Sequence, residues 1–314
     1  MTSKHNLSYS EVKELVDQKG YKKLEEIIFS YLTSNRTRKY SVRGLSKMPE
    51  ENIETLVNLL TDYDDGVQIE AMKGLKNSKK KVRRNYDNLI YPVLAEILKS
   101  ENEGLKREAF KLSNRLDEEV RVNLLINIFK EISDEVLLEE IVFNLAKVED
   151  NEIKNNVKHY MESYIINGGK NRDWAIMALG QLRAYDKILL LRSIIKDKNE
   201  DLETRKAALF ALEDVKDGRA LGIILRAVED RDLEEAAQEA LSTLTLGYGY
   251  RDQLALEKDL NSEEEDLYLS AVFAMDLRDY PKKSELLLQY IEDNNSYVRD
   301  LAEWKVFLIN ETLG

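Results

Sequence analysis

The sequence contains no cysteine and very little proline, glycine or histidine. Its 314 residues include 3 Pro, 13 Gly and 2 His. The lack of Cys excludes disulfides, thiolate catalysis and Cys-ligated zinc, and it favours a reducing compartment. Gly and Pro, which are common in β-turns, are scarce. The most abundant residues, Leu, Glu, Lys, Ala and Ile, favour helix. Because 43% of the residues are hydrophobic, a substantial core can form, and we predict an all-α protein.

Long apolar runs are also absent. The longest, Ile188 to Ile195, is interrupted by Arg192, and no apolar segment follows the first few residues. We therefore expect a soluble cytoplasmic protein that has no membrane partner. The sequence does not predict an oligomeric state.

Charge is distributed unevenly along the chain, whose formal net charge is −12. Residues 1–115 carry 22 Lys and Arg against 17 Asp and Glu, and residues 116–314 carry 25 against 42, so the two parts differ as +5 and −17. This polarity indicates two different binding environments, or a basic end that tolerates phosphates. Chance variation of charged residues on a solvated surface explains this uneven distribution equally well.

One pattern recurs along almost the whole chain: a small residue followed four places later by a large apolar one. The small position is Ala in seven of nine pairs, and successive pairs lie 29 to 38 residues apart. The pairs are Ser41/Leu45, Ala71/Leu75, Ala109/Ser113, Ile141/Leu145, Ala175/Leu179, Ala208/Leu212, Ala237/Leu241, Ala271/Met275 and Ala302/Val306. Residues four apart share one face of a helix, where a small side chain permits close approach.

The spacing fits two short helices and two turns in each repeat. A second apolar segment precedes each pair, as in residues 53–60 and 221–228. We therefore predict a right-handed superhelical α-solenoid of about nine helix pairs, with the recurring pattern on the second helix of each pair. Residues 1–35 are expected to form N-terminal capping helices, and residues 36–314 a single continuous repeat domain.

The second helices resemble those of the HEAT repeat family, and most closely the short HEAT-like repeats of phycobilin lyases. The resemblance covers residues 36–310 and is carried by segments such as 204–212 and 297–302. A basic residue stands three places before the small position in five repeats, at Arg38, Lys106, Arg172, Arg205 and Arg299. The resemblance implies that such residues pair with acids in the turn within a repeat, for which Asp62, Asp197 and Asp293 are placed. Other residues replace the basic one at Gln68, Leu138, Glu234 and Tyr268.

HEAT-like enzymes provide catalytic alternatives, which the residues do not favour. The His-Glu pairs of deoxyhypusine hydroxylase are missing, because neither His5 nor His159 precedes Glu. HEAT-like DNA glycosylases combine Trp with a catalytic Asp, but adjacent residues such as Asp173 and Trp174 point about 100° apart on a helix. No tetrapyrrole-binding residues are recognisable. We predict a non-catalytic protein with no metal and no cofactor.

A partner surface is predicted two residues after each small position, because that place lies about 200° round the helix from the buried face. The column contains Arg43, Lys73, Lys111, Phe143, Met177, Phe210, Glu239, Phe273 and Trp304. All but Glu239 are predicted partner-binding residues. The column faces a groove in this interpretation, and packing between neighbouring repeats is an equally weighted alternative.

A second candidate surface is the basic run within the longest spacing. Its cations are Lys79, Lys80, Lys81, Arg83 and Arg84. They form an anion-binding loop in one interpretation and a solvated loop without a ligand in the other.

The leading functional hypothesis is a scaffold or adaptor that binds a protein or peptide along the concave groove of the solenoid. A nucleic-acid-associated factor that uses the basic N-terminal third is the alternative, and a lyase-like enzyme is a distant one. Fold alone does not decide among them.

Overall fold

The computed structural model describes residues 8–18, 20–30, 33–79, 83–243, 249–275 and 283–313. Within these ranges the regular elements are 19 α-helices and three short 3-10 helices, with no strand. The chain forms two compact units, Met1–Ile132 and Ser133–Gly314. The all-α prediction is confirmed, whereas one continuous domain over residues 36–314 stays a prediction.

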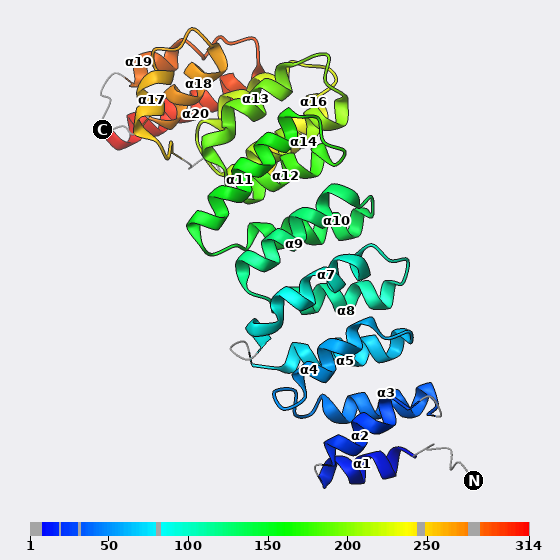
Figure 1. Ribbon diagram of the computed structural model, residues 1–314. Coiled ribbons are helices and arrows are strands. Elements are labelled where there is room, and N and C mark those ends of the chain that lie inside the picture. Colours follow the sequence, from blue (N-terminus) through cyan, green and yellow to red (C-terminus); the bar gives the residue numbers. More distant parts are fainter. Residues whose placement is uncertain are drawn as a thin grey trace, which may run out of the picture. The chain divides into compact units, whose positions relative to one another are not determined.

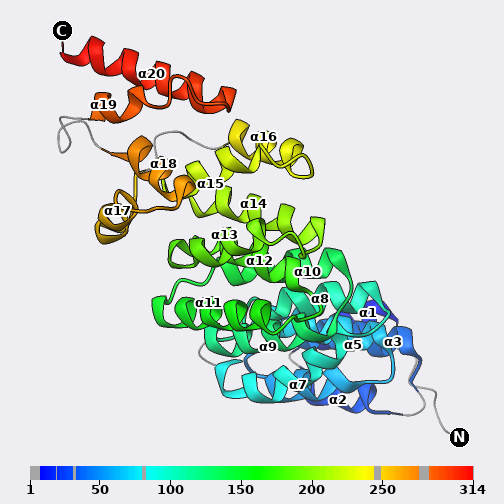
Figure 2. The ribbon, with the colours of Figure 1, turned by 90° about the horizontal axis from the view of Figure 1, so that it is seen from above.

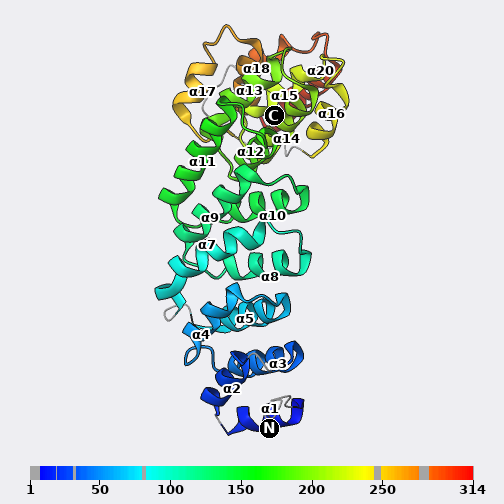
Figure 3. The same ribbon diagram turned by 45° about the vertical axis from the view of Figure 1, so that its right-hand side comes forward.

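Unit 1 alternates first and second helices, as Figures 1 and 3 show. The second helices α3, α5 and α8 pack on one another in sequence, and α1 and α2 pack against α3 at the N-terminal end. The α-helices of this unit are α1 (Tyr9–Asp17), α2 (Tyr21–Ile28), α3 (Asn35–Leu45), α4 (Ile53–Asn58), α5 (Asp65–Asn77), α7 (Asp87–Leu98), α8 (Glu103–Ser113) and α9 (Glu118–Glu131).

Unit 2 begins with the same alternation. Its second helices α10, α12, α14 and α16 pack in sequence. The helices of this unit are α10 (Glu135–Ala146), α11 (Asn151–Ile166), α12 (Arg172–Gln181), α13 (Ile188–Lys196), α14 (Leu202–Val215), α15 (Ala220–Ala227), α16 (Glu234–Thr243), α17 (Gln253–Asp259), α18 (Glu265–Ala274), α19 (Lys283–Leu288) and α20 (Ser296–Leu313).

The recurring small position is the centre of the buried face of every second helix. All nine small positions of the pattern have no exposed surface, including the two atypical ones, Ser41 and Ile141. Each lies on a separate helix, in the order α3, α5, α8, α10, α12, α14, α16, α18 and α20. The predicted solenoid of helix pairs is therefore confirmed, because a small side chain is needed wherever two second helices approach closely.

Arginines at the start of second helices join one repeat to the next. The Nε of Arg38 donates to the carbonyl of Ile28 at 2.8 Å, and the Nε of Arg205 donates to the carbonyl of Ile195, also at 2.8 Å. Each side chain thus satisfies the C-terminal end of the first helix in its own pair. The rest of each guanidinium contacts an acid in the turn of the following pair, Asp62 for Arg38 and Asp230 for Arg205.

Two of the acids expected to pair with these arginines have other roles. The carboxylate of Asp197 accepts from the backbone N–H of Asn199 at 2.9 Å, and Arg205 reaches Asp230 instead. Arg299 donates to the backbone carbonyl of Asp293 at 2.6 Å and not to its carboxylate. Of the three expected acids, only Asp62 contacts one of these arginines, and it does so from the next repeat, so the expected pairing within one repeat was wrong.

The stacking of second helices ends at α16. Helix α18 packs on the first helix α15 instead, and Figure 2 shows these two helices side by side. Gly222 of α15 permits this contact, because a Cβ there would lie 2.1 Å from the carbonyl oxygen of Asp266 and 2.7 Å from Ser270 Oγ. The backbone N–H of Gly222 donates to Ser270 Oγ at 2.8 Å, which satisfies a donor in the first turn of α15.

Arg219, which precedes α15, and Arg226 within α15 contact acids of the C-terminal segment that contains α17 to α20. Arg219 makes a bidentate contact with the buried Asp259 at 2.6 and 2.9 Å. Arg226 binds Asp293 in the same way at 2.6 and 2.9 Å. Bidentate guanidinium–carboxylate pairs fix orientation as well as distance. The contact therefore has one defined geometry.

Candidate functional site

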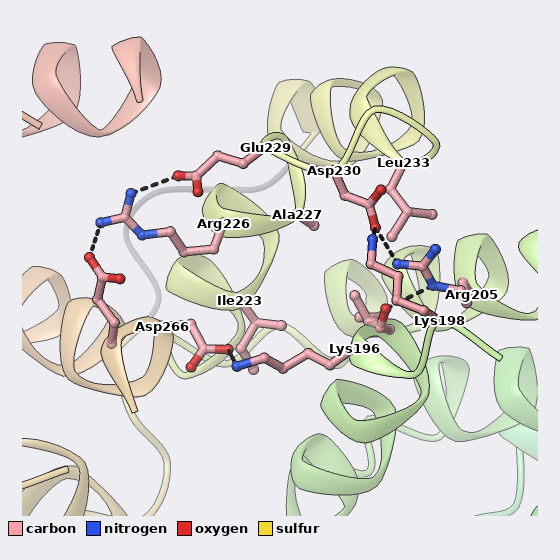
Figure 4. A pocket seen from close by; sticks show the side chains of 12 residues that line it. Lys196, Lys198, Arg205, Ile223, Arg226, Ala227, Glu229, Asp230, Leu233 and Asp266 are labelled. Carbon is pink, nitrogen blue, oxygen red and sulfur yellow. Dashed lines mark hydrogen bonds and ion pairs between the residues drawn. The ribbon is translucent and has the colours of Figure 1, made fainter. Parts of the chain in front are cut away.

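A cavity of about 300 Å³ lies among α13, α14, α15, α16 and α18 (Figure 4). Its walls carry both signs of charge. Lys198 and Arg205 both contact Asp230, whereas Lys196 lies 3.5 Å from the carboxylate of Asp266. Arg226 completes the lining and contacts Glu229, Glu265 and Asp293.

Two acids of this cavity, Asp230 and Asp266, have lowered pKa values. Burial alone would raise the pKa of Asp230, but hydrogen bonds from Lys198 and Arg205 outweigh it and lower that pKa to about 2. Burial likewise opposes ionisation of Asp266, and hydrogen bonds from Arg192 lower its pKa below the usual range. Since every cation in the lining already has a carboxylate partner, this cavity is part of the structure that joins the repeats, and it offers no unpaired charge to a ligand.

A second pocket, of about 280 Å³, has a different lining. Helix α15 contributes Leu221 and Leu225, and α16 contributes Leu241. Leu241 is the large apolar member of the pair Ala237/Leu241. Such pairs mark the buried face of each second helix, here called the seam, yet Leu241 is only half-buried. The corresponding Leu212 of α14 is completely buried, because the next second helix covers it. The pocket therefore exists because, among the described helices, α18 packs on α15 and not on the outer face of α16.

One face of α20 forms the remaining wall. It contributes Tyr297, Asp300, Leu301 and Trp304, which are spaced three, four and seven residues from the first. This spacing places all four on one stripe of the helix. Tyr297 is 40% exposed and Trp304 is 46% exposed, so both rings remain accessible at the pocket. Large, partly exposed aromatic side chains beside an apolar floor are typical of binding surfaces.

The two cations of α20 are directed away from this pocket. Arg299 donates to the carbonyls of Asp293 and Asn294 at 2.6 and 3.1 Å. Lys305 donates to the carbonyl of Phe273 at 2.9 Å, and burial lowers the pKa of its ammonium group. Neither cation neutralises Asp300, whose carboxylate has no side-chain partner among the residues that the structure describes.

The cations of the predicted partner column lie on the surface of unit 1 but are paired. Arg43 and Lys73 both contact Glu70, at 2.9 and 3.0 Å. Lys111 contacts Glu108 at 2.8 Å. The column therefore presents alternating charges rather than an unbroken basic stripe, which weakens its attraction for phosphates.

The apolar members of the column divide into three groups. Phe143 is 52% exposed, with the ammonium group of Lys147 3.6 Å from its ring centre, and Trp304 lines the apolar pocket. Met177 and Phe210 are half-buried. Phe273 is 1% exposed, so the exposure expected for it was wrong. It is buried against Tyr290, with ring centres 5.9 Å apart, because α18 is covered on both sides.

The predicted anion-binding loop is only partly described, since Lys80 and Lys81 lie outside the described residues. Lys79 is exposed, and Arg84 contacts Asp117 at 3.2 Å. Arg83 is 2% exposed and donates to the carbonyl of Ser78 at 3.1 Å and to that of Arg115. The prediction that Arg83 is an exposed anion-binding cation is therefore wrong, because its guanidinium satisfies backbone carbonyls at helix ends.

Sequence reasoning found only Trp304 among the pocket residues. It missed the other six, Leu221, Leu225, Leu241, Tyr297, Asp300 and Leu301. The one available signal was the apolar spacing of Tyr297, Leu301 and Trp304 on a face separate from Ala302. The leucines gave no signal, because their pattern matches that of leucines buried in other repeats.

The described part of the chain contains no group of three or more His, Asp or Glu residues arranged to hold a metal ion. No helix there has both the length and the apolar character needed to cross a membrane. His159 is exposed on α11, and Trp174 on α12 is half-buried.

Comparison with known proteins gave structural likenesses only. No protein-family model matches the chain, and no curated protein matches it. An engineered protein is similar over 97% of this chain and 92% of its own, with 17% identity and a TM-score of 0.41. The karyopherin Kap121p, bound to the extreme C-terminus of the protein phosphatase Cdc14p, is similar over 93% of this chain and 37% of its own, with 15% identity and a TM-score of 0.40. At these identities and TM-scores the two likenesses do not bear on function. The fold assignment rests on the helix pairs themselves.

Proposed function

We propose that this protein is a non-catalytic scaffold that binds a peptide or a helical segment of another protein, and that it does so at the pocket between α15, α16 and α20. The supporting observation is an apolar pocket flanked by two accessible aromatic rings, Tyr297 and Trp304. Exposed aromatic side chains beside an uncovered apolar floor are the usual centre of a protein interface.

This proposal keeps the scaffold hypothesis but moves its centre to one end of unit 2. Trp304 is the predicted partner-binding residue that lines the pocket. A nucleic-acid role for the basic N-terminal third gains no support, because Arg43, Lys73 and Lys111 are paired with acids and Arg83 is buried. Nothing favours the lyase-like alternative. A cytoplasmic location remains part of the proposal and rests on the absence of Cys.

The test is a selection of random 12-residue peptides on the full chain, followed by measurement of the affinity of the selected peptides for variants. Trp304→Ala is expected to weaken binding by about 10- to 100-fold, because truncating a central interface Trp costs about 1–3 kcal/mol. Phe143→Ala is the matched control, since it removes an equally exposed ring from α10. Thermal unfolding of both variants verifies that they are folded.

Two outcomes would contradict the proposal. One is a selection that yields only peptides whose affinity is unchanged by Trp304→Ala. The other is a set of peptides that loses affinity with Phe143→Ala alone. In the second case the predicted column on α10 would be the interface, and the pocket would have no role in binding.

A further inference from the structure

The pocket contains one feature that an ordinary hydrophobic docking site lacks. Asp300 lies on the same stripe of α20 as Tyr297 and Trp304, three residues after the first and four before the second. A helix turn separates it from each ring, so the carboxylate lies between the two aromatic side chains. The leucines of α15 and α16 form the floor beneath it.

We infer that this pocket accepts a lysine or arginine side chain, and that the partner is therefore a basic, partly apolar peptide segment. The inference rests on the proposed function and specifies the chemistry of its ligand. The aliphatic part of a Lys or Arg side chain would lie on Leu221, Leu225 and Leu241, and its charged end would meet Asp300. The rings of Tyr297 and Trp304 would attract the same charged end through cation–π interactions. These are strongest with Trp, and Arg makes them most often.

The carboxylate of Asp300 is available to a ligand because no side chain in the described part of the chain pairs with it. Arg299, its neighbour in sequence, donates to two backbone carbonyls, and Lys305 is committed to the carbonyl of Phe273. By contrast, the buried or partly buried acids that join the helices of unit 2 are already paired: Asp259, Asp266 and Asp293 each hold an arginine in a bidentate contact. An exposed carboxylate without a partner loses little solvation when a cation joins it, so the pairing is a net gain.

The surroundings add to this selectivity. Helix α16 carries three Glu and no basic residue, and residues 116–314 have an excess of 17 acidic over basic side chains. A field of this sign attracts basic segments and repels nucleic-acid phosphates. The acidic part of the chain and the apolar pocket therefore favour the same class of ligand.

The experiment exchanges the charge in the pocket. Peptides selected on the native chain from the random 12-residue library should contain Arg or Lys beside apolar residues. Replacing that basic residue by norleucine, or replacing Asp300 by Asn, should each weaken binding by up to about fivefold, the upper end for an exposed charged pair. Asp300→Lys should reverse the preference, so that a new selection yields Asp or Glu at the same peptide position.

The control is Glu303→Gln, which removes an exposed acid from α20 without altering the pocket lining. It should change affinity by less than about twofold, because exposed charges outside a contact contribute little. Norleucine peptides that bind as well as basic ones, or an unchanged preference in Asp300→Lys, would overturn the inference. If Trp304→Ala still weakened binding of those peptides, the proposed function would stand. If their affinity were unchanged by Trp304→Ala, the docking site itself would be rejected.

Discussion

The second helices of unit 1 and the last second helices of unit 2 carry the same seam pattern but give different surfaces. In unit 1, α3, α5 and α8 stack in order, and charges such as Arg43 and Glu70 pair along the stack. In unit 2 the order breaks after α16, because α18 packs on α15. In the regular stack the cations Arg43, Lys73 and Lys111 are paired with acids, whereas the break is lined by an apolar pocket beside the exposed Asp300. The candidate site of this protein therefore lies where the regular stacking of its second helices stops.

The largest effect should come from placing a charge in the seam. Ala208→Asp in unit 2 and Ala71→Asp in unit 1 each bury a carboxylate at a position with no exposed surface. We expect each to cost more than about 4 kcal/mol of unfolding free energy, because the charge has no partner. Chemical denaturation followed by circular dichroism measures this loss.

The matched control is Leu202→Asp, which adds the same charge to an exposed position in the first turn of α14. It should change stability by less than about 0.5 kcal/mol, since an acid is favoured there by the helix dipole. If only one of the two seam variants were destabilised, the seams of the two units would differ in kind.

Gly222→Ala should produce the next largest effect, because it acts on the break itself. Its Cβ would lie 2.1 Å from the carbonyl oxygen of Asp266, so α18 must move away from α15. We expect a loss of about 1–3 kcal/mol, the usual cost of overpacking, together with weaker peptide binding at the pocket.

Gly104→Ala in α8 is the counterpart in unit 1, where the nearest atom to an added Cβ is Asn102 Oδ1 at 3.2 Å. It should be neutral or stabilise the protein by up to about 1 kcal/mol, because Ala is the better helix former. Calorimetric unfolding of both variants makes the comparison. Equal stability of the two would show that α15 and α18 do not need their close contact.

The smallest predicted effect is an acid-dependent loosening of the ion pairs that join repeats. The pKa of Asp230 is about 2 in the folded protein, below the value of about 3.9 in an unfolded chain. Its stabilisation is complete above about pH 4 and disappears as the pH falls through about 2. Asp266 and Asp293 have lowered pKa values as well and act in the same direction.

Denaturation measured between about pH 5 and 2 should therefore show stability falling with pH, and Asp230→Asn should have a shallower fall. Because Lys198 and Arg205 supply the charge that lowers this pKa, Arg205→Gln should have a similar effect. An identical pH profile for native protein and Asp230→Asn would mean that this pair does not contribute to stability.

The sequence by itself determined the repeat. Nine residues at regular spacing, all small except Ile141, mark nine second helices, and each is completely buried, because residues four apart on a helix share one face whatever surrounds it. The same local rule placed the charged column of Arg43, Lys73 and Lys111 on the surface. The resemblance to HEAT repeats singled out Arg38 and Arg205, but it implied acids within the same repeat, whereas both arginines contact an acid of the following one.

Only the tertiary structure decided where the repetition ends. Leu212 and Leu241 occupy the same place in their repeats, yet the first is buried and the second lines a pocket. The difference depends on whether a helix far along the chain packs on α16 or on α15, and Gly222 and Ser270 settle this at a separation of 48 residues. The pattern of a single helix cannot carry such information, because burial of its outer face depends on a neighbour that the local sequence does not specify.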